Sequence, residues 1–290
     1  MEIKFVFFGS DDFSIAVLDE LKKAGLIPAL VVTAPDRPKG RGLKLAPPQV
    51  KAWSQENRIR CLQPEKLDSG LHSTLNAVRY TLFIVASYGL IVPQNVLDIP
   101  KHGTLNVHPS LLPKYRGPTP IESQILADEK EVGVTIMLMD EKMDHGPIVM
   151  QKKLTLEEIQ NATKLQRRLA HLGGEMLSEA VPKWVKGKIE AKPQNHSQAT
   201  YTKKFIKVDG EINLNDEPYK NFLKIQAFDS YFFTEVGADK RGLHAETRRR
   251  KRIRVLVKSA EYKDGKLRVL RVLPEGRREM SYGEFLRGLR

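Results

Sequence analysis

The sequence predicts an α/β protein: a doubly wound, mostly parallel sheet followed by a small C-terminal β-barrel. In the N-terminal half, short apolar runs with the length of buried strands alternate with stretches of helical periodicity. Near the C-terminus, apolar and basic residues alternate with the period of a strand. The 290 residues exceed the usual size of one domain, so we expect two folded domains.

The first strand–helix–strand unit lies at the N-terminus. Residues 3–8 form an apolar run that ends at Gly9, residues 13–24 carry apolar side chains at helical spacing, and residues 27–32 form a second run. Further strands are expected at 82–86 and 105–107. After the first strand the chain has one glycine and two acidic residues, whereas a dinucleotide-binding turn needs three glycines. This disfavours a nicotinamide-dependent dehydrogenase.

The C-terminal part begins after a long amphipathic helix. Residues 161–187 have helical periodicity, with a kink or break expected at Pro182. The polar stretch 188–200 is expected to be a linker, which gives a catalytic domain at 1–187 and a second domain at 201–290. Within that second domain, strands at 252–262 and 266–273 flank Lys263-Asp264-Gly265, a sequence typical of a hairpin turn.

Composition limits the compartment and the partners. Cys61 is the only cysteine, which excludes an internal disulfide and indicates a reducing compartment. The N-terminal apolar run is too short for a signal peptide, and no stretch approaches a membrane span, so we expect a cytoplasmic protein without a membrane partner. Net charge is +13, and residues 201–290 hold 22 basic and 13 acidic residues, a balance of +9. We therefore expect the C-terminal domain to have a polyanionic partner.

Polar residues capable of acid–base chemistry follow the strand at 105–107. Asn106 and His108 are two positions apart, so their side chains point to the same face of the strand. In doubly wound folds, ligands bind at this carboxyl edge of the sheet. The proline-bounded segment 110–113 leaves the strand with backbone groups that can hydrogen-bond to a flat heterocycle. Asp144 comes 36 residues after His108, far enough for another strand to return it to the same place.

These motifs resemble those of the folate-dependent formyltransferases, whose signature is Asn-x-His, Ser-Leu-Leu-Pro, Gly-Val-Thr and Asp-x-Gly. The matching residues here are Asn106, His108, Ser110–Pro113, Gly133–Thr135, Asp144 and Gly146. Within the family, the resemblance is greatest to the members that act on methionyl-tRNA, and it covers essentially the whole chain. It implies a formyltransferase-type sheet, an OB-like C-terminal barrel that binds tRNA, and 10-formyltetrahydrofolate as the formyl donor.

The resemblance also implies roles for individual residues. Asn106 would donate a hydrogen bond to the developing oxyanion, His108 would move a proton, and Asp144 would orient His108. Whether His108 or Asp144 takes the proton of the amine stays open. The folate site would be formed by Tyr88, Gly89, Ser110, Leu111, Leu112 and Pro113. No metal is needed for this chemistry, and the histidines are too scattered to indicate a metal site.

The acceptor is implied by a long basic loop. Residues 34–48 contain four prolines and two glycines, too many for a buried connector, and the matching loop of the methionyl-tRNA enzymes enters the acceptor end of the tRNA. Expected tRNA contacts are Arg37, Lys39, Arg41 and Lys44 in this loop, and Arg249, Arg250 and Arg252 in the basic run near the C-terminus. The partner is thus expected to be methionyl initiator tRNA, bound by a monomer.

Two other functions remain open from sequence. A formyltransferase or formyl-folate hydrolase of the same family, acting on another amine or on water, would keep the same three polar residues. A noncatalytic tRNA-binding protein on this scaffold would be expected to lose one of them, and the chain has Asn106, His108 and Asp144.

Overall fold

The computed structural model describes residues 3–39, 42, 44–236 and 251–289. The chain divides into two compact units, neither of which is one continuous stretch. Unit 1 comprises residues 1–120, 131–155 and 163–203, and unit 2 comprises residues 121–130, 156–162 and 204–290. Residues 188–200, expected to be a linker, therefore lie within unit 1, and the C-terminal boundary follows Lys203.

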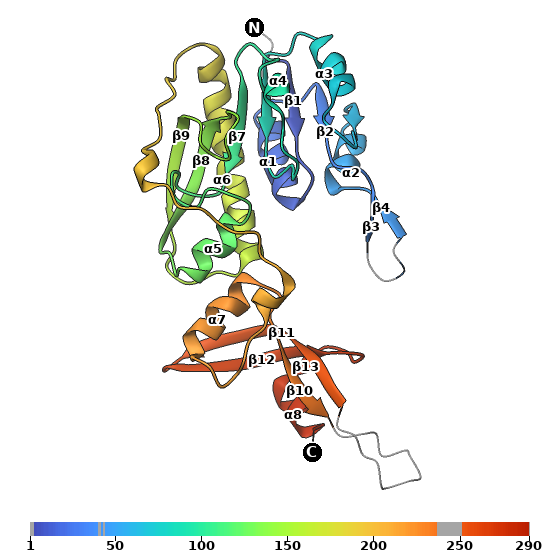
Figure 1. The fold of residues 1–290 in the computed structure, drawn as a ribbon, viewed down its shortest axis with the longest axis vertical. Helices are drawn as coiled ribbons and strands as arrows, with labels where there is room; N and C mark the ends of the chain where they lie inside the picture. The colour runs from blue at the N-terminus through green and yellow to red at the C-terminus, as the bar shows by residue number, and fades with distance from the viewer. Residues whose placement is uncertain (1–2, 40–41, 43, 237–250, 290) are drawn as a thin grey trace. The chain divides into compact units, whose positions relative to one another are not determined.

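Unit 1 is built on a seven-stranded sheet with the order β5-β2-β1-β6-β7-β8-β9 (Figure 1). The five strands from β5 to β7 pair in parallel, and β8 and β9 extend the sheet antiparallel. The mostly parallel α/β sheet expected from sequence is confirmed. Its strands are β1 (Phe5–Phe8), β2 (Leu30–Val32), β5 (Cys61–Leu62), β6 (Leu82–Val85), β7 (Thr104–His108), β8 (Glu131–Leu138) and β9 (Ile148–Thr155).

Helices cover both faces of this sheet. On one face, Val6 and Phe8 belong to a core cluster that also contains the buried leucines of α3. On the other face, α6 packs on the sheet and on α1: Gly173 lies against Val107 and Val134, and Gly174 lies against Glu20. The alternation of strand side chains between two apolar layers explains the continuous apolar runs in the sequence. The helices of unit 1 are α1 (Asp12–Lys23), α2 (Gln49–Glu56), α3 (Ser69–Asn76), α4 (Gln94–Leu97) and α6 (Ala162–Val185, beginning at the unit boundary).

Two local expectations for unit 1 are corrected or refined. Pro182 lies inside α6, and the helix continues to Val185 instead of ending at the proline. A proline near the last turn removes only one hydrogen bond, so the remaining contacts of the helix keep its end ordered. The basic loop forms a short hairpin of β3 (Arg37–Lys39) and β4 (Lys44–Ala46), which is separate from the large sheet.

Unit 2 contains a four-stranded antiparallel sheet with the order β10-β11-β12-β13. Its β11–β12 turn has positive φ angles at Asp264 (52°) and Gly265 (73°), the backbone of a two-residue hairpin, as expected from sequence. One face of the sheet supplies Ile253, Val255 and Val257 to a core shared with Phe285. The elements are α5 (Pro120–Leu126, beginning at the unit boundary), α7 (Pro218–Ala227), β10 (Tyr231–Val236), β11 (Lys251–Lys263), β12 (Lys266–Pro274), β13 (Met280–Ser281) and α8 (Tyr282–Arg287). The expected small β domain is confirmed.

Candidate active site

The candidate site begins at the carboxyl end of β7. Asn106 and His108 alternate with the buried Val107, so both side chains lie on the same face of the strand. Asn106 is half-buried, and its carboxamide has no hydrogen-bond partner among the described residues. His108 is 4% exposed. The carboxamide is therefore available to a ligand, while the imidazole is held by the protein.

Asp144 returns to this point of the sheet, as expected from sequence. Its Oδ1 lies 3.6 Å from His108 Nδ1, and its Oδ2 accepts a hydrogen bond from the backbone N–H of Gly117 at 2.7 Å. Asp144 has a φ of 49°, a left-handed conformation that costs about 1 kcal/mol for a residue with a side chain. The conformation persists because hydrogen bonds fix this backbone, and it directs the carboxylate toward His108.

The hydrogen bond at the other imidazole nitrogen defines the tautomer of His108. Nε2 lies 2.9 Å from the carbonyl oxygen of Tyr115, and a carbonyl can only accept. Nε2 therefore carries the hydrogen and donates it. In the neutral ring, Nδ1 is then the basic nitrogen, and it is the atom that faces Asp144. The arrangement offers a proton acceptor next to a carboxylate.

The segment 110–113, expected to contact the folate, is tied firmly to β8 and β9. Thr135 Oγ1 donates to the carbonyl of Ser110 at 2.7 Å and accepts from the N–H of Leu112 at 3.2 Å. Gln151 Nε2 donates to the carbonyl of Leu112 at 2.9 Å. Ser110 and Leu112 are buried, and Leu111 and Pro113 are half-buried. Because Gly133 lies beneath Leu111, where a Cβ would come within 2.5 Å of that side chain, the segment packs directly on β8.

Tyr88, expected to form part of the folate pocket wall, is buried in a core cluster. It is 3% exposed, and its ring packs edge-on against Phe8 with centroids 5.5 Å apart. Burial raises the pKa of Tyr88 to about 12. Gly89 is exposed with a φ of 83°, so a side chain there would strain the turn after β6. The sequence does not distinguish these two environments, because an aromatic residue that follows a strand can pack in the core or line a ligand site.

Sequence reasoning missed two buried polar residues beside Asp144. Arg116 is 1% exposed and donates to Gln194 Oε1 through Nε (3.2 Å) and Nη2 (2.6 Å). The guanidinium also reaches His196 Nδ1 at 2.9 Å. The pKa of His196 is lowered, first by burial and then by the positive charges of His145 and Arg116. The only sequence signal was Arg116 itself, three residues after Pro113, because Gln194 belongs to a stretch with no periodic pattern.

The expected tRNA contacts divide between the two units. Arg37 and Lys44 are exposed on the β3–β4 hairpin, which also carries Lys39. Arg252 is exposed on β11, and its guanidinium lies over the ring of Phe233 at 4.2 Å. Arg41, Arg249 and Arg250 lie outside the described residues.

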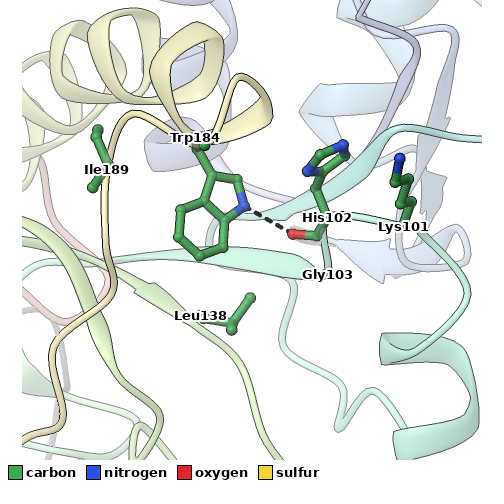
Figure 2. Close-up of a pocket in the computed structure, with 7 residues that line it drawn as sticks. Lys101, His102, Gly103, Leu138, Trp184 and Ile189 are labelled. Atoms are coloured by element: carbon green, nitrogen blue, oxygen red, sulfur yellow. Dashed lines mark hydrogen bonds between the residues drawn. The ribbon is translucent and has the colours of Figure 1, made fainter.

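A surface hollow of about 390 Å³ lies at the other end of β7, away from His108 (Figure 2). Gly103, which precedes the first residue of β7, forms part of it, and Trp184 Nε1 donates to the carbonyl of His102 at 2.8 Å beside it. It is a feature of the packing at the end of α6 and is separate from the candidate site.

In the part of the chain that is described, no group of three or more metal-ligating side chains is found. None of the described helices is both long and apolar enough to span a bilayer.

Known proteins that resemble this chain include formyltransferases. The formyl transferase family model matches residues 1–181. The methionyl-tRNA formyltransferase of Thermodesulfovibrio yellowstonii is 36% identical over 305 residues, covering 99% of this chain and 96% of the relative. That of Chloroflexus aurantiacus is 44% identical over 212 residues, covering 73% of this chain and 68% of the relative.

Solved structures share the fold at lower identity. An N-formyltransferase from Helicobacter canadensis, solved with folinic acid and dTDP-3-aminofucose, aligns with a TM-score of 0.60 at 20% identity, covering 79% of this chain and 81% of that one. A sugar 3N-formyl transferase, solved with dTDP and 5-N-formyl-THF, aligns with a TM-score of 0.61 at 17% identity, covering 96% and 100%. From the sequence relatives and the family model together, this chain belongs to the formyl transferase family.

Proposed function

We propose that this protein transfers the formyl group of 10-formyltetrahydrofolate to the α-amino group of methionyl initiator tRNA. The observation that carries the proposal is the convergence of Asn106, His108 and Asp144 at the end of β7, with His108 Nδ1 3.6 Å from Asp144 Oδ1. These groups supply a neutral hydrogen-bond donor, a base and a carboxylate, which formyl transfer to an amine requires.

Each of the three residues has a distinct role in this reaction. When the amine adds to the formyl carbon, negative charge develops on the formyl oxygen, and the unpartnered carboxamide of Asn106 donates to it. The proton lost by the attacking amine goes to His108 Nδ1, because Nε2 already carries a hydrogen. The carboxylate of Asp144 then stabilises the imidazolium that results. When the tetrahedral intermediate collapses, the bond between the formyl carbon and the folate nitrogen breaks, the imidazolium returns its proton to that nitrogen, and tetrahydrofolate leaves. Of the two candidates that the sequence left open, we thus propose His108 as the proton acceptor.

The residues present also suit a folate donor. The donor supplies the formyl carbon, and Ser110–Pro113 together with Gly89 would hold its ring system at the carboxyl edge of the sheet. Support comes from the hydrogen bonds that Thr135 and Gln151 make to the segment, which keep its backbone in one conformation. A preorganised segment loses little entropy when a flat ring binds against it.

The acceptor is inferred from the relatives and from charge. The relatives of 36% and 44% identity are named methionyl-tRNA formyltransferases. We assign catalysis to unit 1, which includes residues 188–200, and tRNA binding to the β3–β4 hairpin and to residues 204–290 of unit 2. The proposed phosphate contacts are Arg37, Lys39, Arg41, Lys44, Arg249, Arg250 and Arg252. Such an enzyme would work as a monomer and without a metal. It would act in the cytoplasm, where folate and charged tRNA are found.

The test is a formyl-transfer assay with purified protein. Methionyl initiator tRNA, methionyl elongator tRNA and uncharged initiator tRNA are compared as acceptors, with 10-formyltetrahydrofolate as donor. Formyl-methionyl product on the initiator tRNA alone supports the proposal. Donor cleavage with free formate in every tube would identify a hydrolase and reject it. Binding of tRNA without any turnover would identify a noncatalytic tRNA-binding protein.

A further inference from the structure

Gln194 uses every hydrogen-bonding position of its side chain. Nε2 donates to the backbone carbonyls of Asp144 (2.9 Å) and Gly146 (2.7 Å), while Oε1 accepts two hydrogen bonds from Arg116. The residue is 5% exposed. A carboxamide has two donor hydrogens and two acceptor lone pairs, so it has no capacity left. Its orientation is also defined, because the oxygen must face the guanidinium and the nitrogen must face the two carbonyls.

The carbonyls that Gln194 binds flank the candidate catalytic turn. Asp144 holds a left-handed backbone conformation, and Gly146 packs so closely that a Cβ there would meet the carbonyl oxygen of Leu138 at 1.9 Å. A turn of this kind needs bonds that hold it in place. Gln194 supplies two of them, at residues 144 and 146, from a part of the chain 50 residues away.

The same stretch of chain also holds the backbone next to Arg116. The N–H of Arg116 donates to the carbonyl of Thr200 at 2.9 Å, and the N–H of Thr202 donates to the carbonyl of Arg116 at 2.7 Å. Tyr115, which accepts from His108, and Gly117, which donates to Asp144, are the two neighbours of Arg116. Residues 194–202 therefore support both members of the His108–Asp144 pair.

We propose that Gln194 is a positioning residue for Asp144. It acts by holding the backbone of the 144–146 turn, so that the carboxylate faces His108 Nδ1; the inference rests on the proposed formyl transfer for its activity readout. Displacement of a reacting group by about 1 Å can lower a rate on the order of 100-fold. Loss of the two bonds to the turn should therefore lower kcat and leave the KM values for both substrates nearly unchanged.

A simpler role would be to neutralise the buried Arg116. Every acceptor of the Arg116 guanidinium among the described residues is uncharged. In this simpler role, the Gln194 side chain would be needed only for its oxygen, which accepts hydrogen bonds from Arg116. Gln194→Glu separates the two roles. A glutamate keeps the acceptor and adds an ion pair with Arg116, but it loses both N–H donors to Asp144 and Gly146. If Gln194 serves only Arg116, Gln194→Glu keeps wild-type kcat.

The experiment measures steady-state formyl transfer and thermal unfolding for four proteins: wild type, Gln194→Glu, Gln194→Met and Gln198→Glu. Gln198 is exposed on the same stretch, and its side chain makes no hydrogen bond among the described residues, so Gln198→Glu controls for the added charge. We expect kcat to fall about 10–100-fold in Gln194→Glu, with KM within about 2-fold and a melting temperature close to wild type. Wild-type kcat in a folded Gln194→Glu protein overturns the proposal.

A double substitution supplies a second test, which does not depend on the behaviour of Gln194→Met. In an Asp144→Ala background there is no carboxylate to position, so adding Gln194→Glu should lower kcat no further. A further loss of about 10-fold or more in the double variant would mean that Gln194 acts on something other than Asp144 and would also overturn the proposal. Absence of formyl transfer in the wild type itself would instead be a failure of the proposed function.

Discussion

At the scale of single residues, the proposed chemistry depends on groups held at short distances by the backbone. His108 donates to the carbonyl of Tyr115, and Asp144 accepts from the N–H of Gly117, so two residues that are far apart in sequence meet through one loop. The remaining polar group, the carboxamide of Asn106, is the one without a partner among the described residues. A catalytic group that must bind developing charge is expected to be available in this way.

Replacing each of the three residues by alanine should therefore reduce turnover without reducing tRNA affinity. We expect Asn106→Ala to lower kcat by about 10²–10³-fold and His108→Ala and Asp144→Ala by about 10²–10⁴-fold, since they act on charge that forms during the reaction. Steady-state kinetics and a tRNA filter-binding assay measure the two effects. Near-wild-type kcat in any one variant removes that residue from the mechanism.

Gly146 should be as sensitive as the polar residues, for a steric reason. A Cβ at this position would lie 1.9 Å from the carbonyl oxygen of Leu138, and a backbone atom cannot move aside without moving β8. We expect Gly146→Ala to cost on the order of 3 kcal/mol in unfolding free energy and to displace Asp144. Gly283→Ala is the matched control, because its Cβ would meet nothing closer than 3.6 Å. Equal denaturation midpoints for the two variants would contradict the steric reading.

At the scale of elements, the basic β3–β4 hairpin is anchored at its base, and its side chains Arg37 and Lys44 are exposed. Asp36 precedes β3, pairs with Lys51 Nζ at 2.9 Å and accepts from Gln63 Nε2 at 2.6 Å. The hydrogen bond from Gln63, and next the one from Lys51, lower the pKa of Asp36. An anchored hairpin suits a polyanionic partner when its basic side chains are exposed, as those of Arg37 and Lys44 are.

We predict that Arg41→Ala impairs transfer to methionyl-tRNA and leaves folate binding intact. In the sequence, Arg41 falls between β3 and β4. These two strands form a hairpin that is separate from the seven-stranded sheet, whose strand β7 carries Asn106 and His108. The readouts are KM for tRNA and the dissociation constant for a folate analogue. Lys66→Ala serves as a charge-matched control outside this hairpin. A comparable loss of folate affinity in Arg41→Ala would show that the loop belongs to the folate site.

The sheet of unit 2 carries a second basic surface, formed by Arg252 and Arg254 on β11. Their guanidinium groups lie over Phe233 and Tyr231 of β10, at 4.2 and 5.5 Å from the ring centroids. Stacking on an aromatic ring restrains the arginine while leaving its charge accessible to a phosphate. Because the two alternate with the buried Ile253, they lie on the face of the sheet opposite the core.

Replacing Arg252 and Arg254 by glutamine should weaken tRNA binding and make it less dependent on salt. Each lost phosphate contact should reduce the slope of log affinity against log salt by about 0.7–0.9. Lys263→Gln with Lys266→Gln, at the hairpin end of the same sheet, removes the same charge elsewhere. An equal reduction of slope in both double variants would mean that only the net charge of unit 2 matters.

At the scale of the whole molecule, the two units are interleaved along the chain. Unit 2 takes residues 121–130 and 156–162 from between the stretches of unit 1. Within unit 2, Tyr219 Oη donates to Asp128 at 2.8 Å, which joins α7 to one of these insertions. The chain that carries the candidate catalytic residues and the basic sheet therefore cannot be divided at one point without splitting a folded unit.

A fragment ending at Lys203 should consequently be less stable than the full chain, although it contains all of unit 1. The fragment would retain residues 121–130 and 156–162 but lose the rest of unit 2, leaving the side chains of Ile125 and Leu156 without that unit's packing. We expect its melting temperature to fall by several degrees and its tRNA affinity to fall with a shallower salt slope. Calorimetry and salt-dependent binding measure both effects. An unchanged melting temperature would show that the inserted segments fold without unit 2.

The sequence by itself determined the strands β1, β2, β6, β7, β11 and β12, the long helix α6, the hairpin turn of unit 2 and the common face of Asn106 and His108. These follow from local periodicity, because residues two or four apart have fixed relative directions in a strand or helix. Only the tertiary structure decided the rest. It turned Tyr88 into the core, made 188–200 part of unit 1, and brought Gln194 to the backbone of Asp144 across 50 residues. Contacts between distant segments depend on the packing of whole layers, and no local pattern records which side chains that packing brings together.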